Sequence, residues 1–235
     1  MEKYLICLNL DDTLLNKKKK ISFLSNLVLK EILQRGHYLI LTSKEDYQTI
    51  FPYIKKLKLY NYPFICLNGG AIYYINRKKI ITKNIANYID DKDLNNYIKS
   101  IDNYLSLTFY SLEKSSNILI KNCIGLKITI KKDLKKAKFL NYFVLEKNQD
   151  TITYLITSKK ASKYNSLVYI KNRFKIKANN VITFNFDQSD QEIYSSFENS
   201  YFINNSSLEG NKTKKPSYKN GVINTLIEKY RKVLF

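Results

Sequence analysis

The feature that most constrains the fold is a short apolar run near the start of the chain that ends in a polar, acidic cluster. The run extends from Tyr4 to Leu8, and Asn9, Asp11, Asp12 and Thr13 follow it. An apolar run of this length without alternation favours a strand buried on both faces, as in a parallel sheet. Open α/β sheets place their chemistry at the carboxyl ends of such strands, so the polar cluster is a candidate site. A strand that simply runs into an Asp-rich turn is the plainer interpretation of the same residues.

These opening residues resemble the first motif of the haloacid-dehalogenase-like superfamily, in particular its Cof-type sugar-phosphatase branch. That family carries Asp-x-Asp-Gly-Thr-Leu-Leu after its first strand, and this chain reads Asn-Leu-Asp-Asp-Thr-Leu-Leu from Asn9 to Leu15. The resemblance implies that Asn9 stands at the position of the nucleophilic Asp and Asp11 at that of the general acid/base. Asn9 departs from the family, because a neutral amide is a poor nucleophile for the covalent aspartyl-phosphate route.

Later motifs resemble the family in the same order. Thr42-Ser43-Lys44 corresponds to Thr-Gly-Arg, whose Thr binds the phosphoryl group, and Ala161-Ser162-Lys163 to the Ser-Lys-Gly step that supplies a phosphate-binding Lys. Asn204-Asn205-Ser206 resembles the Asn-Ala turn of the family. The resemblance therefore implies a phosphate-type pocket. Its residues would be Thr13, Thr42, Lys163 and Asn205.

The motif that should hold a metal ion is also altered. The family reads Gly-Asp-x-x-Asn-Asp, and this chain reads Asn-Phe-Asp-Gln-Ser-Asp from Asn185 to Asp190. Without a gap, Phe186 replaces the metal-binding Asp and Asp190 keeps the second position. Asp187 comes one residue late, and such a shift along a strand reverses the side chain unless a bulge restores it. The resemblance implies magnesium only if the chain is active, held by Asp190 with Asn9 and the Asp11 main chain, or by Asp187, in an impaired site.

The order of elements predicts an α/β fold, with a Rossmann-like core built on a five-stranded parallel sheet and a small inserted α+β cap. We expect the core in residues 1–81 and 158–235, and the cap in residues 82–157. Parallel strands are predicted at residues 4–8, 38–41, 64–67, 181–184 and 201–203, with a hairpin through 72–74. In the cap we expect a helix at 90–101 and strands at 105–110, 117–120, 126–130 and 151–156. The first helix of the core should bury a face formed by Leu24, Leu27, Val28 and Ile32.

Charge and composition limit the kinds of partner that the chain can have. The net charge is +20 with a pI of about 9.6, yet the arginines are few. Nucleic-acid recognition favours Arg, so we expect non-specific attraction to RNA or another polyanion through a Lys-rich surface rather than base-specific binding. A codon bias of an AT-rich genome is an alternative source of the lysines. Three scattered cysteines predict a reducing, cytoplasmic compartment, and the sequence predicts neither a membrane partner nor a signal peptide. The oligomeric state stays open.

The leading functional hypothesis is a degenerate phosphatase homologue that is catalytically inactive, retains a phosphate-type pocket and acts as a binding, structural or regulatory protein. Its ligand would be a phosphorylated small molecule. One alternative is a weakly active magnesium-dependent phosphohydrolase of small phosphorylated metabolites. The other is a basic scaffold associated with RNA or the ribosome.

Overall fold

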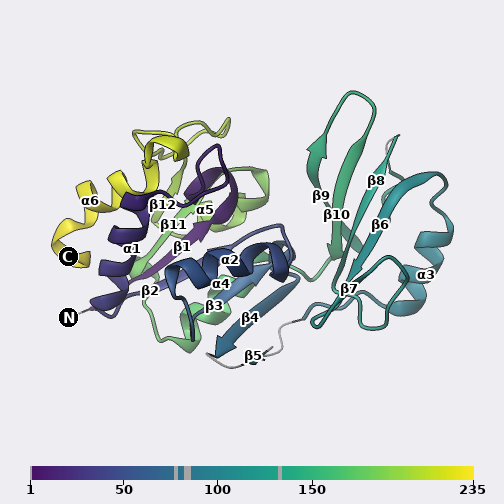
Figure 1. Cartoon of the computed structure of the whole chain (residues 1–235), viewed down its shortest axis with the longest axis horizontal. Coiled ribbons are helices and arrows are strands. Elements are labelled where there is room, and N and C mark those ends of the chain that lie inside the picture. The colour runs from purple at the N-terminus through teal and green to yellow at the C-terminus, as the bar shows by residue number, and fades with distance from the viewer. Residues whose placement is uncertain (1, 77–78, 82–85, 132–133) are drawn as a thin grey trace.

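The core of the protein is a twisted sheet of seven strands (Figure 1). This computed structural model describes residues 2–76, 79–81, 86–131 and 134–235. Across the sheet the strands run in the order β12-β11-β1-β2-β3-β4-β5. The first five of these are parallel, and β4 and β5 continue the sheet as antiparallel neighbours. Their bounds are β1 Leu5–Asn9, β2 Tyr38–Thr42, β3 Pro63–Cys66, β4 Ala71–Asn76, β5 Lys79–Ile81, β11 Val181–Asn185 and β12 Asn199–Phe202.

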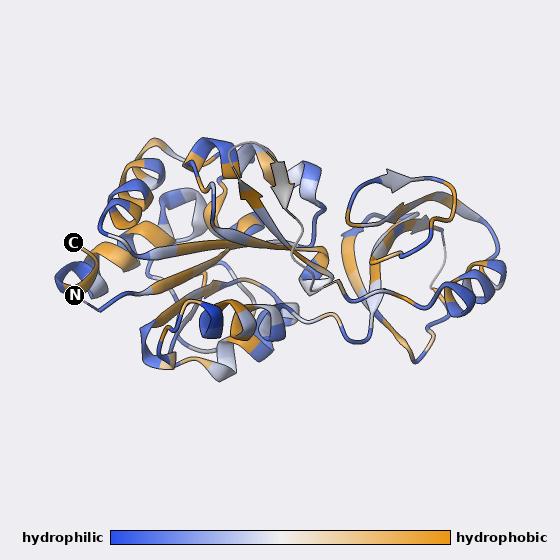
Figure 2. Cartoon of the chain, turned by 90° about the horizontal axis from the view of Figure 1, so that it is seen from below, coloured by the Kyte–Doolittle hydropathy of each residue, from blue (hydrophilic) through white to orange (hydrophobic). Residues whose placement is uncertain are grey.

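Helices cover both faces of this sheet, which is why its parallel strands are apolar throughout. Ile6 and Leu8 of β1 pack into one buried cluster with residues of α1, α2 and α6, and Leu5 and Cys7 pack into another with residues of α4 and α5. Figure 2 shows the apolar strands running between the helical layers. The helices are α1 Phe23–Gln34, α2 Tyr47–Leu57, α4 Lys163–Arg173, α5 Gln191–Ser196 and α6 Gly221–Leu234.

A second module lies beside the core and has its own sheet and its own apolar cluster. Its strands pair antiparallel in the order β7-β6-β8-β10-β9, and Leu94 and Tyr97 of its helix pack on the sheet. The elements are α3 Asp91–Lys99, β6 Tyr104–Tyr110, β7 Ser115–Ser116, β8 Gly125–Ile130, β9 Leu140–Lys147 and β10 Ile152–Ser158. We call this module the cap.

The predicted fold class is confirmed, whereas several local predictions are wrong. Residues 117–120 are not a strand, and β9 was not predicted at all. Leu24 and Leu27 lie outside the buried face of α1, which is formed by Ser25, Leu29 and Ile32. The predicted cap limits, 82 and 157, stay a prediction, and the first of them falls outside the described residues.

Within the core, a tight turn after β3 touches the start of α4. Gly69 in this turn has a φ of +94°, and a Cβ atom there would lie 2.2 Å from the main-chain carbon of Ser162. Ser162 caps α4 by accepting a hydrogen bond from the Asn165 amide at 3.1 Å. The close approach needs glycine twice over, for its conformation and for its missing side chain. It places the first residue of α4, Lys163, against the end of β1.

Candidate active site

The polar residues that follow β1, β2 and β11 meet at one edge of the core sheet, beneath the cap. Asn9 is the last residue of β1, and the chain then makes a wide turn that the Leu15 amide closes on the Leu10 carbonyl at 3.1 Å. Asp12 takes a positive φ of 53° inside this turn. The turn therefore carries the chain away from the sheet directly after Asn9 and leaves Asp11 and Asp12 beside the edge.

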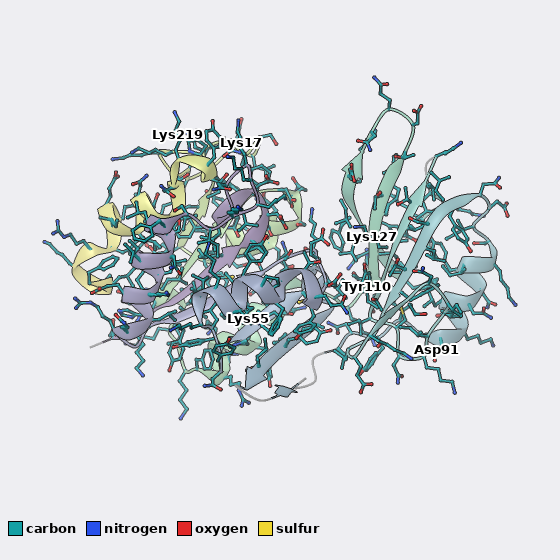
Figure 3. All side chains as sticks on the ribbon, in the orientation of Figure 1. Lys17, Lys55, Asp91, Tyr110, Lys127 and Lys219 are labelled. Atoms are coloured by element: carbon teal, nitrogen blue, oxygen red, sulfur yellow. The ribbon has the colours of Figure 1, made fainter. Side chains whose placement is uncertain are left out.

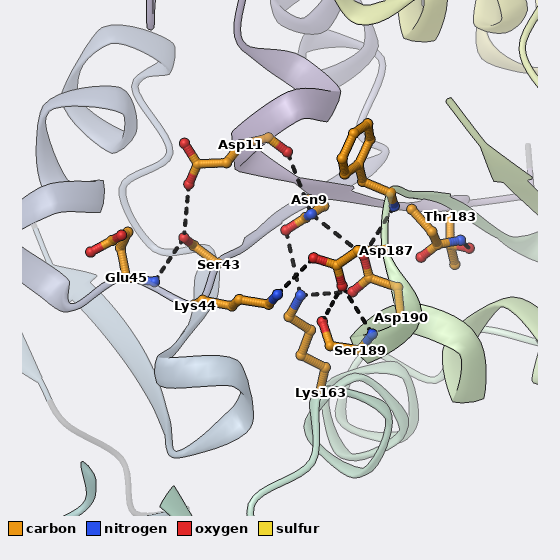
Figure 4. A network of polar contacts seen from close by, with 12 residues as sticks. Asn9, Asp11, Ser43, Lys44, Glu45, Lys163, Thr183, Asp187, Ser189 and Asp190 are labelled. Carbon is orange, nitrogen blue, oxygen red and sulfur yellow. Dashed lines mark hydrogen bonds and ion pairs between the residues drawn. The ribbon is translucent and has the colours of Figure 1, made fainter. Parts of the chain in front are cut away.

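A buried ion pair forms the centre of the site (Figure 4). The Lys163 Nζ atom lies 2.7 Å from Asp190 Oδ1, and both side chains are 1% exposed. The carboxamide of Asn9 lies between them: its Nδ2 donates to Asp190 Oδ2 at 3.4 Å, and its Oδ1 accepts from Lys163 at 3.5 Å. The Phe186 amide also donates to Asp190 Oδ2, at 3.0 Å. Each charged group at the centre thus has partners within the protein.

Two further ion pairs surround this centre. Lys44 Nζ contacts Asp187 Oδ2 at 2.6 Å, and Lys19 Nζ contacts Asp11 Oδ1 at 2.7 Å. Ser43 Oγ donates to the second oxygen of Asp11 at 3.4 Å. Three carboxylates of the site are therefore matched by three lysines, each within hydrogen-bond distance.

The surroundings of Asp187 and Glu45 shift the pKa values of these two acidic side chains in opposite directions. Burial acts to raise the pKa of Asp187, but the charge and hydrogen bond of Lys44, together with the hydroxyl of Ser189, outweigh it and lower the pKa to about 2. Burial raises the pKa of Glu45, and the charge of Lys127 in the cap opposes that shift only in part. Asp187 is therefore a carboxylate at neutral pH, with its charge already satisfied by Lys44.

A cavity of about 180 Å³ lies between this network and the cap. Val144 and Leu145 of β9 close one side, and Leu145 also packs against the buried cluster of the core. Its core lining is Asn9, Asp11, Asp12, Lys19, Lys44, Glu45, Phe186 and Asp187.

The residues predicted for a phosphate pocket are not all brought together. Lys163 reaches Asn9, but Lys163, Thr13 and Thr42 are buried and do not line the cavity. Thr13 has no hydrogen-bond partner for its hydroxyl among the described residues. Asn205 is exposed and lines a different hollow, of about 160 Å³. The lysines on the cavity wall are instead Lys19 and Lys44. The sequence analysis named Lys44 within a motif but did not assign it to the site, and it did not single out Lys19.

Asp187 faces the cavity, whereas the sequence predicted that its side chain would be reversed unless a bulge restored it. The alternation of side chains applies only within a strand, and β11 ends at Asn185. Phe186 and Asp187 lie beyond the strand, and both contribute to the cavity wall. Asp187 then caps a short turn by accepting a hydrogen bond from the Ser189 amide at 2.9 Å. The end of the strand, rather than a bulge, brings the side chain round.

The side chains at this edge do not fit a magnesium ion as they stand. Magnesium needs several oxygen donors with negative charge to spare, and it gives up its water ligands reluctantly. Here Asn9 is neutral, Phe186 offers no side-chain oxygen, and lysines already pair with Asp187 and Asp190. Within the described part of the chain, no group of three His, Cys, Asp or Glu residues is placed to hold a metal.

The fold and the position of this edge define a class of protein: a doubly wound α/β core with a cap inserted ahead of its last two parallel strands. The family model for haloacid dehalogenase-like hydrolases matches residues 6–153, more than half of the chain. The chain belongs to this family.

Solved structures agree on the fold. TM0651 from Thermotoga maritima superposes with a TM-score of 0.74 at 16% identity, over 95% of this chain and 96% of that one. A haloacid dehalogenase-like hydrolase from Bacteroides thetaiotaomicron gives a TM-score of 0.76 at 16% identity, over 96% and 98%. BT1666 from the same organism, described as one of the phosphatases of the HAD superfamily, gives 0.73 at 15%, over 96% and 94%. No curated protein matches the sequence.

Proposed function

We propose that this chain is a non-catalytic member of the haloacid dehalogenase-like family, acting as a binding, structural or regulatory protein. The observation that carries the proposal is the neutral side chain of Asn9 and its hydrogen bonding. Its neutral amide stands at the position that the family resemblance assigns to the nucleophile, and it is hydrogen-bonded to both members of a buried ion pair. Attack on phosphorus by the family route needs an anionic oxygen there, and loss of such a nucleophile costs on the order of a million-fold in rate.

The ligand we propose is a phosphorylated small molecule bound in the 180 Å³ cavity. Lys19 and Lys44 on its wall are the cations that would contact the phosphoryl group. Both lysines already pair with carboxylates, so an incoming anion has to displace Asp11 or Asp187. We therefore expect weak binding, because the ligand has to break the ion pair between a lysine and its carboxylate.

One observation favours a second function, that of a weakly active magnesium-dependent phosphohydrolase. Asp187 faces the cavity together with Asp11 and supplies a carboxylate that Phe186 does not. If Lys44 released Asp187, the two carboxylates would offer magnesium an anionic pair of ligands. In that case Asp11 would take over the attack on phosphorus or the activation of water.

Phosphatase assays on a generic phosphoester, with and without magnesium, separate the two functions. The wild type is compared with the double variant Asn9→Asp, Phe186→Asp, which restores the nucleophile and a metal ligand. We expect no turnover by the wild type and magnesium-dependent turnover by the repaired variant, because the rest of the fold is in place. Repair of Phe186 alone serves as the control, and it should remain silent because it lacks the nucleophile.

Turnover by the wild type that depends on magnesium and disappears in Asp11→Asn and Asp187→Asn would overturn the proposal in favour of the second function. If the repaired variant folds but shows neither turnover nor magnesium binding, the ion pairs between lysines and the site carboxylates are sufficient to exclude the metal. Binding of inorganic phosphate, followed by calorimetry in the wild type and in Lys44→Gln, tests the ligand. We expect the variant to bind more weakly.

A further inference from the structure

The amino-terminal end of α1 exposes a patch of large apolar side chains. Phe23 is 78% exposed, Leu27 49% and Leu24 39%. Positions i, i+1 and i+4 of a helix share one side, so the three side chains form a single patch. The buried face of the same helix is formed by Ser25, Leu29 and Ile32. An exposed cluster of this kind indicates contact with something outside the chain.

Lysines lie beside the amino-terminal end of this patch. Ser22 Oγ donates a hydrogen bond to Asn220 Oδ1 at 2.7 Å, which places the next residue, Phe23, close to Lys219. Lys17 Nζ lies 4.6 Å from the ring centroid of Tyr218, itself 43% exposed. Figure 3 shows Lys17 and Lys219 along the same edge of the core. We call this surface the basic apolar face. Its residues are Lys17, Lys18, Lys20, Phe23, Leu24, Leu27, Tyr218 and Lys219.

The positive charge of this face is offset only in part, by Asp12, which lines the same hollow as Lys17 and Tyr218. Residues 17–20 and 211–219 contain eight lysines and no acidic residue. Among the described residues, Lys19 and Lys214 pair with Asp11 and Glu228, whereas the four lysines of the basic apolar face form no ion pair. The one acidic side chain of α1, Glu31, is held by Arg35 at 3.0 Å. The surface therefore combines an excess of cations with exposed apolar groups.

We propose that the basic apolar face binds the surface of an anionic lipid membrane, a partner that the sequence alone did not predict. Lysines attract acidic headgroups as point charges, and side chains such as Phe23, Leu24 and Leu27 enter the boundary between headgroups and acyl chains. No helix in the described part of the chain is long and apolar enough to cross a bilayer.

The chemistry of this face favours a lipid surface over a nucleic acid or a second copy of the chain. Leucines do not stack on bases, and recognition of bases favours arginine, which the face lacks. A second copy of the chain would bring lysine against lysine in a protein whose net charge is +20. The proposal goes beyond the proposed function, because it concerns a different surface and stands whether or not the cavity supports turnover.

A tryptophan introduced at position 23 tests the proposal directly, since the chain contains no other tryptophan. The full-length Phe23→Trp variant is titrated with phosphatidylcholine vesicles that contain 30% phosphatidylserine, in 150 mM salt. We expect a blue shift of the emission as the indole leaves water, and no shift with vesicles of phosphatidylcholine alone. Co-sedimentation of the wild type with both vesicles confirms that the tryptophan has not created the binding.

Two pairs of variants locate the contact. Lys17, Lys18, Lys20 and Lys219 are replaced together by Gln, and the control replaces Lys92, Lys99, Lys121 and Lys147 of the cap, which lowers the net charge equally. We expect the first variant to bind about fivefold more weakly for each lysine lost, and the control to change little. Phe23→Gln should bind at least tenfold more weakly, whereas Ile118→Gln, at an equally exposed cap position, should not.

Several results would overturn the proposal. Absence of a blue shift and of co-sedimentation would remove the membrane contact. If the lysine variants of the basic apolar face and of the cap lose equal vesicle affinity, the binding is a non-specific attraction by the net charge of the chain. If single-stranded RNA binds the Phe23→Trp variant more tightly than the vesicles do and displaces them, the face belongs to nucleic acid instead.

Discussion

At the scale of single residues, the centre of the site depends on one buried lysine and one buried aspartate. Lys163→Met would leave the Asp190 charge buried, with only the Asn9 amide and the Phe186 main-chain amide as partners. We expect a loss of about 3–5 kcal/mol in the free energy of unfolding, because breaking a buried pair strands a charge. Urea denaturation of the variant measures this loss.

The control is Lys177→Met, since Lys177 forms a comparably short pair with Glu2 on the open surface. Water and salt screen that pair, so the free energy of unfolding should hardly change. The double variant Lys163→Met, Asp190→Asn should recover most of the loss, because it removes the stranded charge. Equal losses in the buried and the surface variant would contradict the role given to the Lys163–Asp190 pair.

The sequence allowed part of the site to be predicted. Asn9 and Lys163 belong to motifs that resemble a family, and the structure brings their side chains together across more than 150 intervening residues. The pairing of Lys44 with Asp187 could not be predicted, because it depends on where β11 ends and on how two loops face each other. The position of Lys44 two residues after β2, within a motif that resembles Thr-Gly-Arg, was the signal that could have indicated it.

At the scale of elements, the contact between Gly69 and Ser162 ties the turn after β3 to the start of α4. Gly69→Ala combines a positive φ with direct overlap on the main chain of Ser162. We expect it to destabilise the protein by about 2–6 kcal/mol, from backbone strain and overpacking together. Thermal or urea unfolding measures the effect.

Gly36→Ala is the matched control. Gly36 also has a positive φ, of +84°, but nothing lies within 4 Å of the added methyl group. Its effect should be limited to backbone strain of about 1–2 kcal/mol. Two equal effects would mean that the overlap at Ser162 relaxes without consequence, and that the junction between the turn and α4 is looser than described.

Elements could be predicted where burial made their pattern plain. The parallel strands of the core are continuous apolar runs, since helices cover both of their faces. β9 was missed because its side chains are mostly half-exposed and do not alternate. Residues 117–120 were mistaken for a strand because Ile118 and Leu119 are apolar, yet both are exposed. The same confusion assigned Leu24 and Leu27 to the wrong side of α1.

At the scale of the whole molecule, an excess of twenty positive charges opposes compaction. The structure describes six ion pairs, which neutralise only a small part of the forty basic residues. Screening should therefore stabilise the fold. We expect the melting temperature to rise by about 2–4 °C between 20 mM and 500 mM sodium chloride, which corresponds to about 1 kcal/mol.

The cap variant that replaces Lys92, Lys99, Lys121 and Lys147 by Gln provides the comparison. It carries less charge to screen, so its melting temperature should depend less steeply on salt. A melting temperature that falls with salt in the wild type would mean that favourable pairs outweigh the general repulsion.

The order of strands in the core also decides when the sheet can close during synthesis. β1 lies between β2 and β11, and its residues pair with Val181 to Phe184 on one side. The whole cap is made before that partner leaves the ribosome. Until then the central strand has one bare edge, open to pairing with other chains. β1 is thus translated before both of its neighbours in the sheet and is among the last core strands to be enclosed.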